Sequence, residues 1–100
     1  MQSIQKEPFM KHNVYFEGKV QSLGLATAQG PATVGVISPG KFTFSTSTEE
    51  RMVITSGTLK VKLPGKDWAV MKINNEFIVS AKASFDVEAD ADVSYICYYR

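Results

Sequence analysis

The stretch TFSTSTEERMVITSGTLKVKL, from Thr43 to Leu63, decides the fold class of this 100-residue chain. A β-rich run ends in polar residues, and two more such runs flank Gly57. The segment TLKVKL alternates aliphatic residues with lysines. Because side chains on a strand point alternately to opposite faces, the aliphatic residues predict a buried face and the lysines a solvated one.

Segments of the same kind fill the chain from Val14 onward, and no window carries a long helical period. Turn-forming residues separate them at 29–31, 38–40, 56–57, 64–67 and 74–75. Short strands at such spacing are typical of a sandwich or small barrel. We therefore predict an all-β, single-domain barrel over residues 14–100, preceded by a polar N-terminal arm over residues 1–13.

Alternation within three strand segments also predicts which side chains face the core. The residues expected to point inward are Phe42, Phe44, Leu59, Val61, Phe85 and Val87. The last segment, VSYICYYR, carries apolar groups in both of its alternating rows. We expect this strand to be covered on both faces, and a second copy of the chain is one way to cover its outer face. A short chain has little spare core, so we predict a homodimer.

Composition excludes several classes of protein. The chain is 44% hydrophobic and 21% charged, with a net charge of +1, so no strong field points to nucleic acid or to a membrane surface. No apolar run approaches the roughly 20 residues that span a bilayer. The start MQSIQKEPFMKHN has no apolar signal core, and Cys97 is the single cysteine, so it has no partner for an internal disulfide. We expect a cytoplasmic protein.

The spacing of Glu50 and Gly57 resembles the first motif of the cupins, which are small jelly-roll barrels. In the cupin pattern, two histidines precede that glutamate and a third follows in a second motif. Here the four ligand positions read Phe44, Thr46, Glu50 and Phe85. In the second motif, Asn74 and Lys82 take the two glycine positions, and asparagine is tolerated in left-handed turns.

One carboxylate and one hydroxyl offer too few donors for a transition metal, so we predict no metal site and no cofactor. The remaining cavity would have aromatic walls, hydroxyl groups and one carboxylate. Aromatic walls suit a flat ring, and the carboxylate suits the hydroxyl groups of a sugar, from which it accepts hydrogen bonds.

A closer resemblance involves several ordered segments. They are YFEGKVQSLG at 15–24, ATVGV at 32–36, GKFTFST at 40–46, ExMxI at 50–54, SGTLKVKLPG at 56–65 and SYICYY at 94–99. Together they resemble the small cupin-type pyrimidine/purine nucleoside phosphorylases. The resemblance implies a pentosyltransferase of broad specificity, which converts a nucleoside and inorganic phosphate to a free base and α-D-(deoxy)ribose 1-phosphate. It also supports self-association.

The chain departs from that family at two places. It reads VSAKASF at 79–85 where members resemble VPGxSxF, and Tyr98 stands where a member can carry arginine. Arg100 lies two residues further on the same strand face and is an alternative source of charge for phosphate.

The candidate roles follow from the chemistry of phosphorolysis, in which positive charge develops on the sugar while phosphate attacks it. We assign catalytic roles to Glu50 and Thr46. The substrate-binding candidates are Thr43, Phe44, Ser45, Phe85, Lys19 and Arg100. Each also has a plain structural interpretation: core packing for the phenylalanines, ordinary strand chemistry for the hydroxyl residues, and a solvated surface for the cations.

Two other functions remain open from the residues alone. One is a metal-free cupin that binds a sugar or another small ligand without catalysis. The other is a structural or interaction module whose cavity has no ligand. Phosphate-dependent release of a base separates the phosphorylase from both.

Overall fold

The computed structural model describes residues 10–100. Most of the predicted N-terminal arm, residues 1–9, lies outside the described residues. The first strand begins at His12, two residues before the predicted start of the barrel. Among the described residues, no helix has the length and apolar character needed to cross a membrane.

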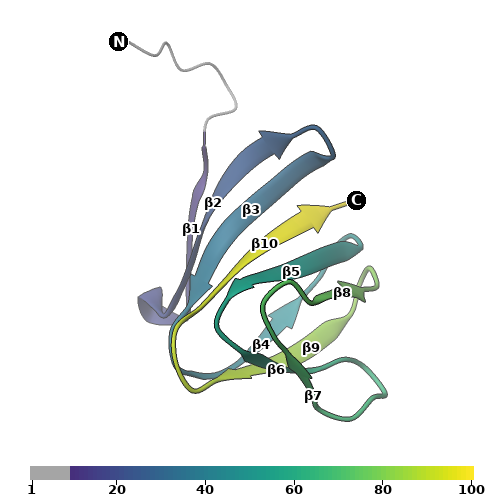
Figure 1. Ribbon diagram of the computed structural model, residues 1–100. Coiled ribbons are helices and arrows are strands. Elements are labelled where there is room, and N and C mark those ends of the chain that lie inside the picture. The colour runs from purple at the N-terminus through teal and green to yellow at the C-terminus, as the bar shows by residue number, and fades with distance from the viewer. Residues whose placement is uncertain (1–9) are drawn as a thin grey trace.

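The larger of the two β-sheets has six strands, all paired in antiparallel fashion (Figure 1). In spatial order they are β1 (His12–Tyr15), β2 (Val20–Thr27), β3 (Gly30–Ile37), β10 (Val93–Tyr99), β5 (Glu50–Ser56) and β8 (Glu76–Val79). The C-terminal strand β10 therefore lies between β3 and β5, in the middle of the sheet.

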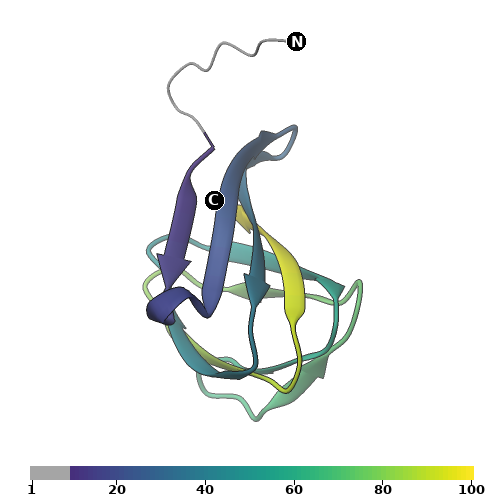
Figure 2. The same cartoon turned by 90° about the vertical axis from the view of Figure 1, so that its left-hand side faces the viewer.

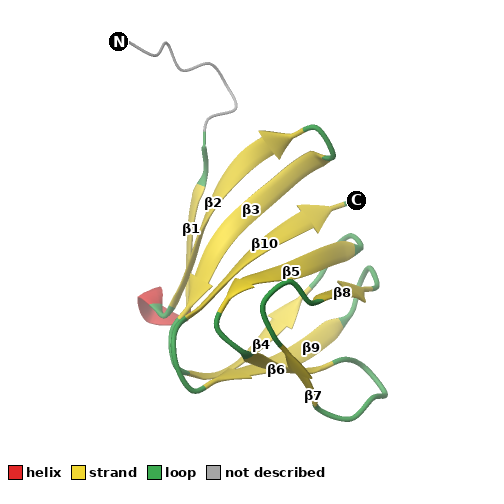
Figure 3. Cartoon of the chain, viewed as in Figure 1, coloured by secondary structure: helices red, strands yellow, loops and turns green. Residues whose placement is uncertain are grey.

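The smaller sheet has four antiparallel strands. Its order is β4 (Gly40–Ser45), β9 (Ser84–Ala89), β6 (Leu59–Lys62) and β7 (Ala69–Met71). Within residues 10–100 the strands are joined by loops and by one short 3-10 helix, η1 (Phe16–Gly18) (Figure 3). The prediction of an all-β barrel is confirmed.

The core is formed by the inward-facing side chains of both sheets, as strand alternation predicted. Five of the six residues predicted to face inward are buried: Phe42, Leu59, Val61, Phe85 and Val87. The sixth, Phe44, is half-buried and packs against the same cluster. Burying side chains of this size contributes about 1.5–3 kcal/mol each to folding, which explains why the alternation pattern was so informative.

The turn between β1 and β2 has an uncommon backbone that affects the interior of the barrel. These two strands lie side by side, and η1 sits at their shared end (Figure 2). Phe16, Glu17 and Gly18 have positive φ angles of 52°, 58° and 90°, a conformation that only glycine adopts readily. In this turn the Phe16 ring centroid lies 4.9 Å from that of Phe42, a core residue of β4. The turn therefore brings an N-terminal aromatic ring to the edge of the core.

At the two glycine positions of the second cupin motif, this chain has residues with a left-handed backbone conformation. Asn74 has a φ of 71° and Lys82 a φ of 56°. The expectation of a left-handed turn at Asn74 is thus confirmed. The local conformation has been kept at both positions although neither residue is glycine.

Replacing Lys82 with glycine should stabilise the protein. The left-handed conformation costs a non-glycine residue about 1–2 kcal/mol, and the greater freedom of glycine in the unfolded chain offsets about 0.5–1 kcal/mol of the gain. We expect Lys82→Gly to raise the free energy of unfolding by about 0.5 kcal/mol in urea denaturation. The matched variant Asn74→Gly should change it less, because asparagine tolerates this region better. A loss of stability in Lys82→Gly would contradict the strain argument.

Candidate functional site

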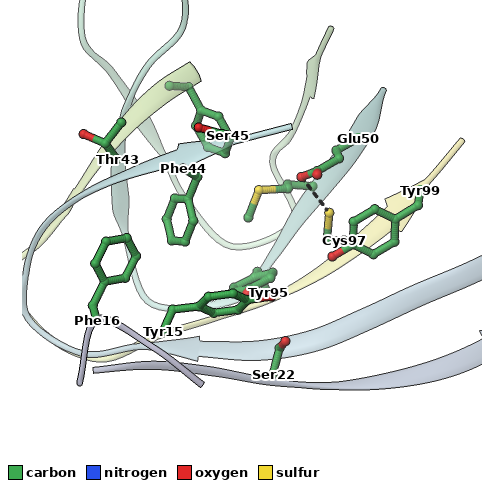
Figure 4. Close-up of a pocket in the computed structure, with 12 residues that line it drawn as sticks. Tyr15, Phe16, Ser22, Thr43, Phe44, Ser45, Glu50, Tyr95, Cys97 and Tyr99 are labelled. Atoms are coloured by element: carbon green, nitrogen blue, oxygen red, sulfur yellow. Dashed lines mark hydrogen bonds between the residues drawn. The ribbon is translucent and has the colours of Figure 1, made fainter. Parts of the chain in front are cut away.

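A pocket of about 200 Å³ opens between the two sheets (Figure 4). Its lining combines aromatic rings, hydroxyl groups, two sulfur atoms and one carboxylate. The lining residues are Tyr15, Phe16, Ser22, Thr43, Phe44, Ser45, Glu50, Met52, Phe85, Tyr95, Cys97 and Tyr99. The volume is below the roughly 300–1,000 Å³ typical of sites for whole small-molecule ligands, so we expect a ligand as large as a nucleoside to extend from the mouth.

Three phenylalanines form one wall of the pocket. Phe44 and Phe85 are direct partners on β4 and β9, and their ring centroids lie 5.6 Å apart. Phe16 meets Phe44 edge to face at 5.5 Å. The structure therefore brings two predicted aromatic residues together and adds a third. Such a wall can stack on the flat face of either a purine or a pyrimidine.

Among the described residues, Glu50 is the one carboxylate that lines the pocket. It is the first residue of β5, lies opposite Tyr99 of β10, and is half-buried. The thiol of Cys97 donates a hydrogen bond to Glu50 Oε1, with a sulfur–oxygen distance of 3.4 Å. Burial raises the pKa of Glu50 above its ordinary value, and the bond from Cys97 offsets part of this increase. The carboxylate is therefore held in a poorly solvated site where a positive charge would be attracted strongly.

Two tyrosines of β10 bring hydroxyl groups to the same pocket. An added Cβ on Gly35 would lie 2.4 Å from the Tyr95 ring, so the missing side chain at Gly35 makes room for that ring. The Tyr99 hydroxyl lies 2.9 Å from Thr33 Oγ1. Burial raises the pKa of both tyrosines, so each keeps its proton and can donate a hydrogen bond at neutral pH.

Thr43 and Ser45 border the pocket, but their side chains belong to the other face of β4. They flank Phe44 in the strand, so alternation directs them away from its ring, and Figure 4 shows Thr43 pointing away from the phenylalanines. Thr43 Oγ1 donates to Asp86 Oδ1 at 2.6 Å, and the hydroxyl of Ser45 lies 3.3 Å from that of Ser84. These hydroxyl groups link β4 to β9 on the outside of the sheet.

Thr46 is buried but does not line the pocket. Its hydroxyl donates to the carbonyl of Ser80 at 2.7 Å and accepts from the backbone N–H of Ala83 at 3.0 Å. The side chain thereby fastens the loop between β8 and β9. In this arrangement the Thr46 hydroxyl is hydrogen-bonded to backbone groups and does not face the pocket.

The predicted cations also lie elsewhere. Lys19 borders a separate groove on the outer face of the six-stranded sheet. Arg100 is exposed and pairs with Glu49 at 3.6 Å. A further cation, Arg51, lies on the outer face, with its guanidinium 4.4 Å from the Tyr98 ring centroid. Among the residues in the described part of the chain, no lysine, arginine or histidine lines the pocket.

Several lining residues were given no role by sequence reasoning. Tyr15 and Phe16 reach the pocket through the β1–β2 turn, for which the sequence carried no recognisable signal. Tyr95 and Tyr99 had a signal, because they belong to the inward row of the last strand. Cys97 belongs to the same row. It is buried, and it also contacts Glu50.

A metal site finds no support in the donor set of this pocket. Within residues 10–100, no group of three or more histidine, cysteine, aspartate or glutamate side chains lies close enough to hold an ion. The four cupin ligand positions hold two phenylalanine rings, a hydroxyl that is bonded to the backbone, and Glu50.

Comparisons with known proteins agree with the resemblance found in the sequence. The family described as "Pyrimidine/purine nucleoside phosphorylase" matches residues 10–99. A Pseudomonas putida (strain GB-1) protein of that name is 44% identical over 89 residues, which are 88% of this chain and 95% of the relative. A Vibrio parahaemolyticus protein of unknown function has a crystal structure that matches with a TM-score of 0.86 at 37% identity, over 91% of this chain and 98% of that one.

The fold also has more distant neighbours. A cupin-like protein from Thermotoga maritima matches with a TM-score of 0.64 at 18% identity, over 78% of this chain and 65% of that one. The predicted cupin-like fold is therefore confirmed.

Neutralising Glu50 should change the pH dependence of stability. The folded protein holds the Glu50 proton to higher pH than the unfolded chain, in which the pKa has its ordinary value of 4.5. The free energy of unfolding therefore contains a contribution that is present below this value and is lost as the pH rises through the raised pKa. We expect Glu50→Gln to gain stability relative to the unmodified protein at neutral pH, and to lose this advantage in acid.

Urea denaturation of both proteins at about pH 4 and at about pH 7 measures this difference. Glu17→Gln, at an exposed residue of the β1–β2 turn, is the control and should show no such change between the two conditions. An advantage of Glu50→Gln that is equal at both pH values would contradict the assignment to burial.

Proposed function

The chain belongs to the pyrimidine/purine nucleoside phosphorylase family, and from this premise we propose that it catalyses the phosphorolysis of nucleosides. The bond from the anomeric carbon of the sugar to the base nitrogen breaks, and a phosphate oxygen forms the new bond to that carbon. The base leaves with a proton on its nitrogen, which balances the proton that phosphate loses, and the sugar becomes α-D-(deoxy)ribose 1-phosphate. The reaction is a pentosyl transfer.

The observation that carries this proposal is a single half-buried carboxylate in a pocket with aromatic walls. Positive charge develops on the sugar in the transition state, and a poorly solvated carboxylate stabilises that charge more than it stabilises the neutral substrate. Glu50 has no cationic partner among the described pocket residues that would neutralise it. We propose that its carboxylate faces the sugar, where it accepts hydrogen bonds from sugar hydroxyls or stabilises the developing cation.

The aromatic wall supports broad specificity for the base. Phe16, Phe44 and Phe85 offer ring faces and edges and no hydrogen-bond donors or acceptors that select one base. Stacking depends weakly on the identity of a base, whereas polar groups in a site discriminate strongly. We propose that purine and pyrimidine nucleosides both bind with the base against this wall.

Phosphate would be held by neutral donors in this arrangement. The pocket offers the hydroxyl groups of Tyr15, Tyr95 and Ser22. Tyrosine and serine hydroxyls can each donate one hydrogen bond to an anion. Lys19 and Arg100 lie outside the pocket. We therefore propose that hydroxyl groups of β1, β2 and β10 bind the phosphate.

A metal-free binding module remains the second candidate, and one observation favours it. Among the described residues, the pocket lining contains no basic side chain, although enzymes that act on phosphate commonly use one. Ligand binding without turnover would support this candidate.

The proposed activity predicts that uridine and adenosine lose their base only when phosphate is present. The assay measures free base and pentose 1-phosphate with and without phosphate. Glu50→Gln should lower turnover by about 10²-fold or more, equivalent to about 3 kcal/mol, because it keeps the shape of the side chain and removes its charge. The control is Glu49→Gln, whose carboxylate pairs with Arg100 outside the pocket and which should retain activity.

The other outcomes have distinct meanings. Base release that does not require phosphate would make the protein a hydrolase. If Glu50→Gln stays active while Glu50→Ala does not, Glu50 orients the sugar through hydrogen bonds and its charge matters little. Full activity of Glu50→Ala would place the chemistry on another residue, and no release from any nucleoside would favour the binding module.

We propose that the protein works as a homodimer, paired through the outer face of the six-stranded sheet. A row of aliphatic side chains crosses four neighbouring strands there in register: Leu23, Val34, Ile96 and Val53. Leu23 and Val34 are 47% and 45% exposed, which is unfavourable for aliphatic groups in water. A second copy that covers the same face would bury them in a two-fold contact.

A cytoplasmic location fits the free thiol of Cys97.

A charge in the middle of this face should dissociate the dimer. Light scattering should give about twice the 11.0 kDa mass of the chain for the unmodified protein and the monomer mass for Val34→Glu. The matched control is Val70→Glu, at a similarly exposed valine of β7 in the smaller sheet. A monomer for the unmodified protein at micromolar concentration would contradict the proposal.

A further inference from the structure

The thiol of Cys97 lies in the pocket, and the proposed reaction gives it no task. Its side chain is 2% exposed, and its sulfur lies 3.4 Å from Glu50 Oε1. Cys97 sits two residues before Tyr99, the direct partner of Glu50 across the β5–β10 pair. All three side chains therefore lie on the inner face of the sheet, and strand pairing sets their spacing.

The hydrogen bond between Cys97 and Glu50 has a defined donor and acceptor. An ionised carboxylate only accepts hydrogen bonds, so the Cys97 thiol donates to Glu50. The hydroxyl of Tyr99, two residues further along β10, lines the same pocket. The Tyr99 oxygen in turn lies 2.9 Å from the hydroxyl of Thr33, which is buried on β3 and can act as its donor. Two hydrogen-bonded pairs, Thr33–Tyr99 and Cys97–Glu50, thus lie next to each other on the inner face of the sheet.

Among the described residues, the thiol of Cys97 is the side-chain hydrogen-bond donor to Glu50. Among the described residues, the other titratable groups that line the pocket are Cys97, Tyr95 and Tyr99 from β10 and Tyr15 from β1. The residues that β2, β4 and β9 contribute to the pocket are phenylalanines and hydroxyl residues, and β5 adds Met52. None of these carries a positive charge. The ionised form of Glu50 is therefore stabilised by a hydrogen-bond donor, and no described cation in the pocket stabilises it.

We propose that Cys97 is a positioning residue that acts through Glu50, and that its hydrogen bond, beside the Thr33–Tyr99 pair, orients the carboxylate and keeps it ionised for the reaction. The catalytic consequence rests on the proposed function. The hydrogen-bonded link itself is a property of the free protein. A thiol is a weak donor, so it offsets only part of the effect of burial on Glu50.

Titration of Glu50 in the free protein tests the link without any substrate. Carbon-13 labelling of glutamate reports each side-chain carboxyl, and Glu50→Gln identifies the signal of Glu50 by its loss. In Cys97→Ala the ionised form loses its donor, so the titration midpoint of Glu50 should move to higher pH. Tyr99→Phe keeps the ring and removes the next donor, so it should cause a smaller shift in the same direction.

Two controls separate this effect from lost packing. Val93→Ala removes a buried side chain from the same inner row of β10, away from Glu50, and should lower stability without moving the Glu50 midpoint. Tyr98→Phe removes a hydroxyl on the outer face of the same strand and should also leave the midpoint unchanged. Identical midpoints in the unmodified protein, Cys97→Ala and Tyr99→Phe would overturn the proposal. Tyr99→Phe decides the matter if Cys97→Ala does not fold.

Activity provides the second readout. For nucleoside phosphorolysis, the acid limb of the kcat/KM profile should move to higher pH in Cys97→Ala, by a factor of about three or more in proton concentration. Rates on the neutral side should change less. A uniform loss at all pH values, with an unmoved Glu50 midpoint, would indicate a structural role and overturn the proposal. A moved midpoint in a protein that does not release base would support the link and refute the phosphorylase function.

Discussion

The pairing of β10 between β3 and β5 is the constraint on which the rest of the structure depends. Without this strand, the hairpin of β2 and β3 would have no connection to β5 and β8 within the larger sheet. The same strand supplies Tyr95, Cys97 and Tyr99 to the pocket and places Tyr99 opposite Glu50. The last seven strand residues of the chain therefore both close the barrel and position the carboxylate. Because the two tasks share one strand, changes that loosen the sheet should also disturb the site.

The second determining feature is the poor solvation of the pocket. Glu50 would be an ordinary surface acid if it lay in water, where charges at a few ångströms interact weakly. Between the sheets, burial raises its pKa, and the hydrogen bond from the thiol of Cys97 offsets part of that increase. A carboxylate held in this way interacts strongly with any positive charge that forms beside it. Under the proposed function that charge is the sugar at the transition state.

The cupin framework persists here although the residues that usually define its metal centre are absent. Left-handed conformations remain at Asn74 and Lys82, the two glycine positions of the second motif. At the metal positions the structure has Phe44 and Phe85 in contact, and the Thr46 hydroxyl bonded to a loop backbone. The backbone pattern and the chemistry of the site are thus separable. The former follows from turns and alternation, whereas the latter depends on a few side chains that point inward.

The sequence by itself determined the barrel, its inward residues and the aromatic and acidic character of the pocket. These follow from local rules, because alternation along a strand assigns each side chain to a face. Phe44 and Phe85 were found in this way, and the resemblance to the first cupin motif indicated Glu50. Only the tertiary structure decided what the hydroxyl and charged residues do, since hydrogen bonds depend on which strands become neighbours. Pairing of β4 with β9 engages Thr43 and Ser45 outside the sheet, and pairing of β10 with β5 brings Cys97 to Glu50, at a separation of 47 residues along the chain.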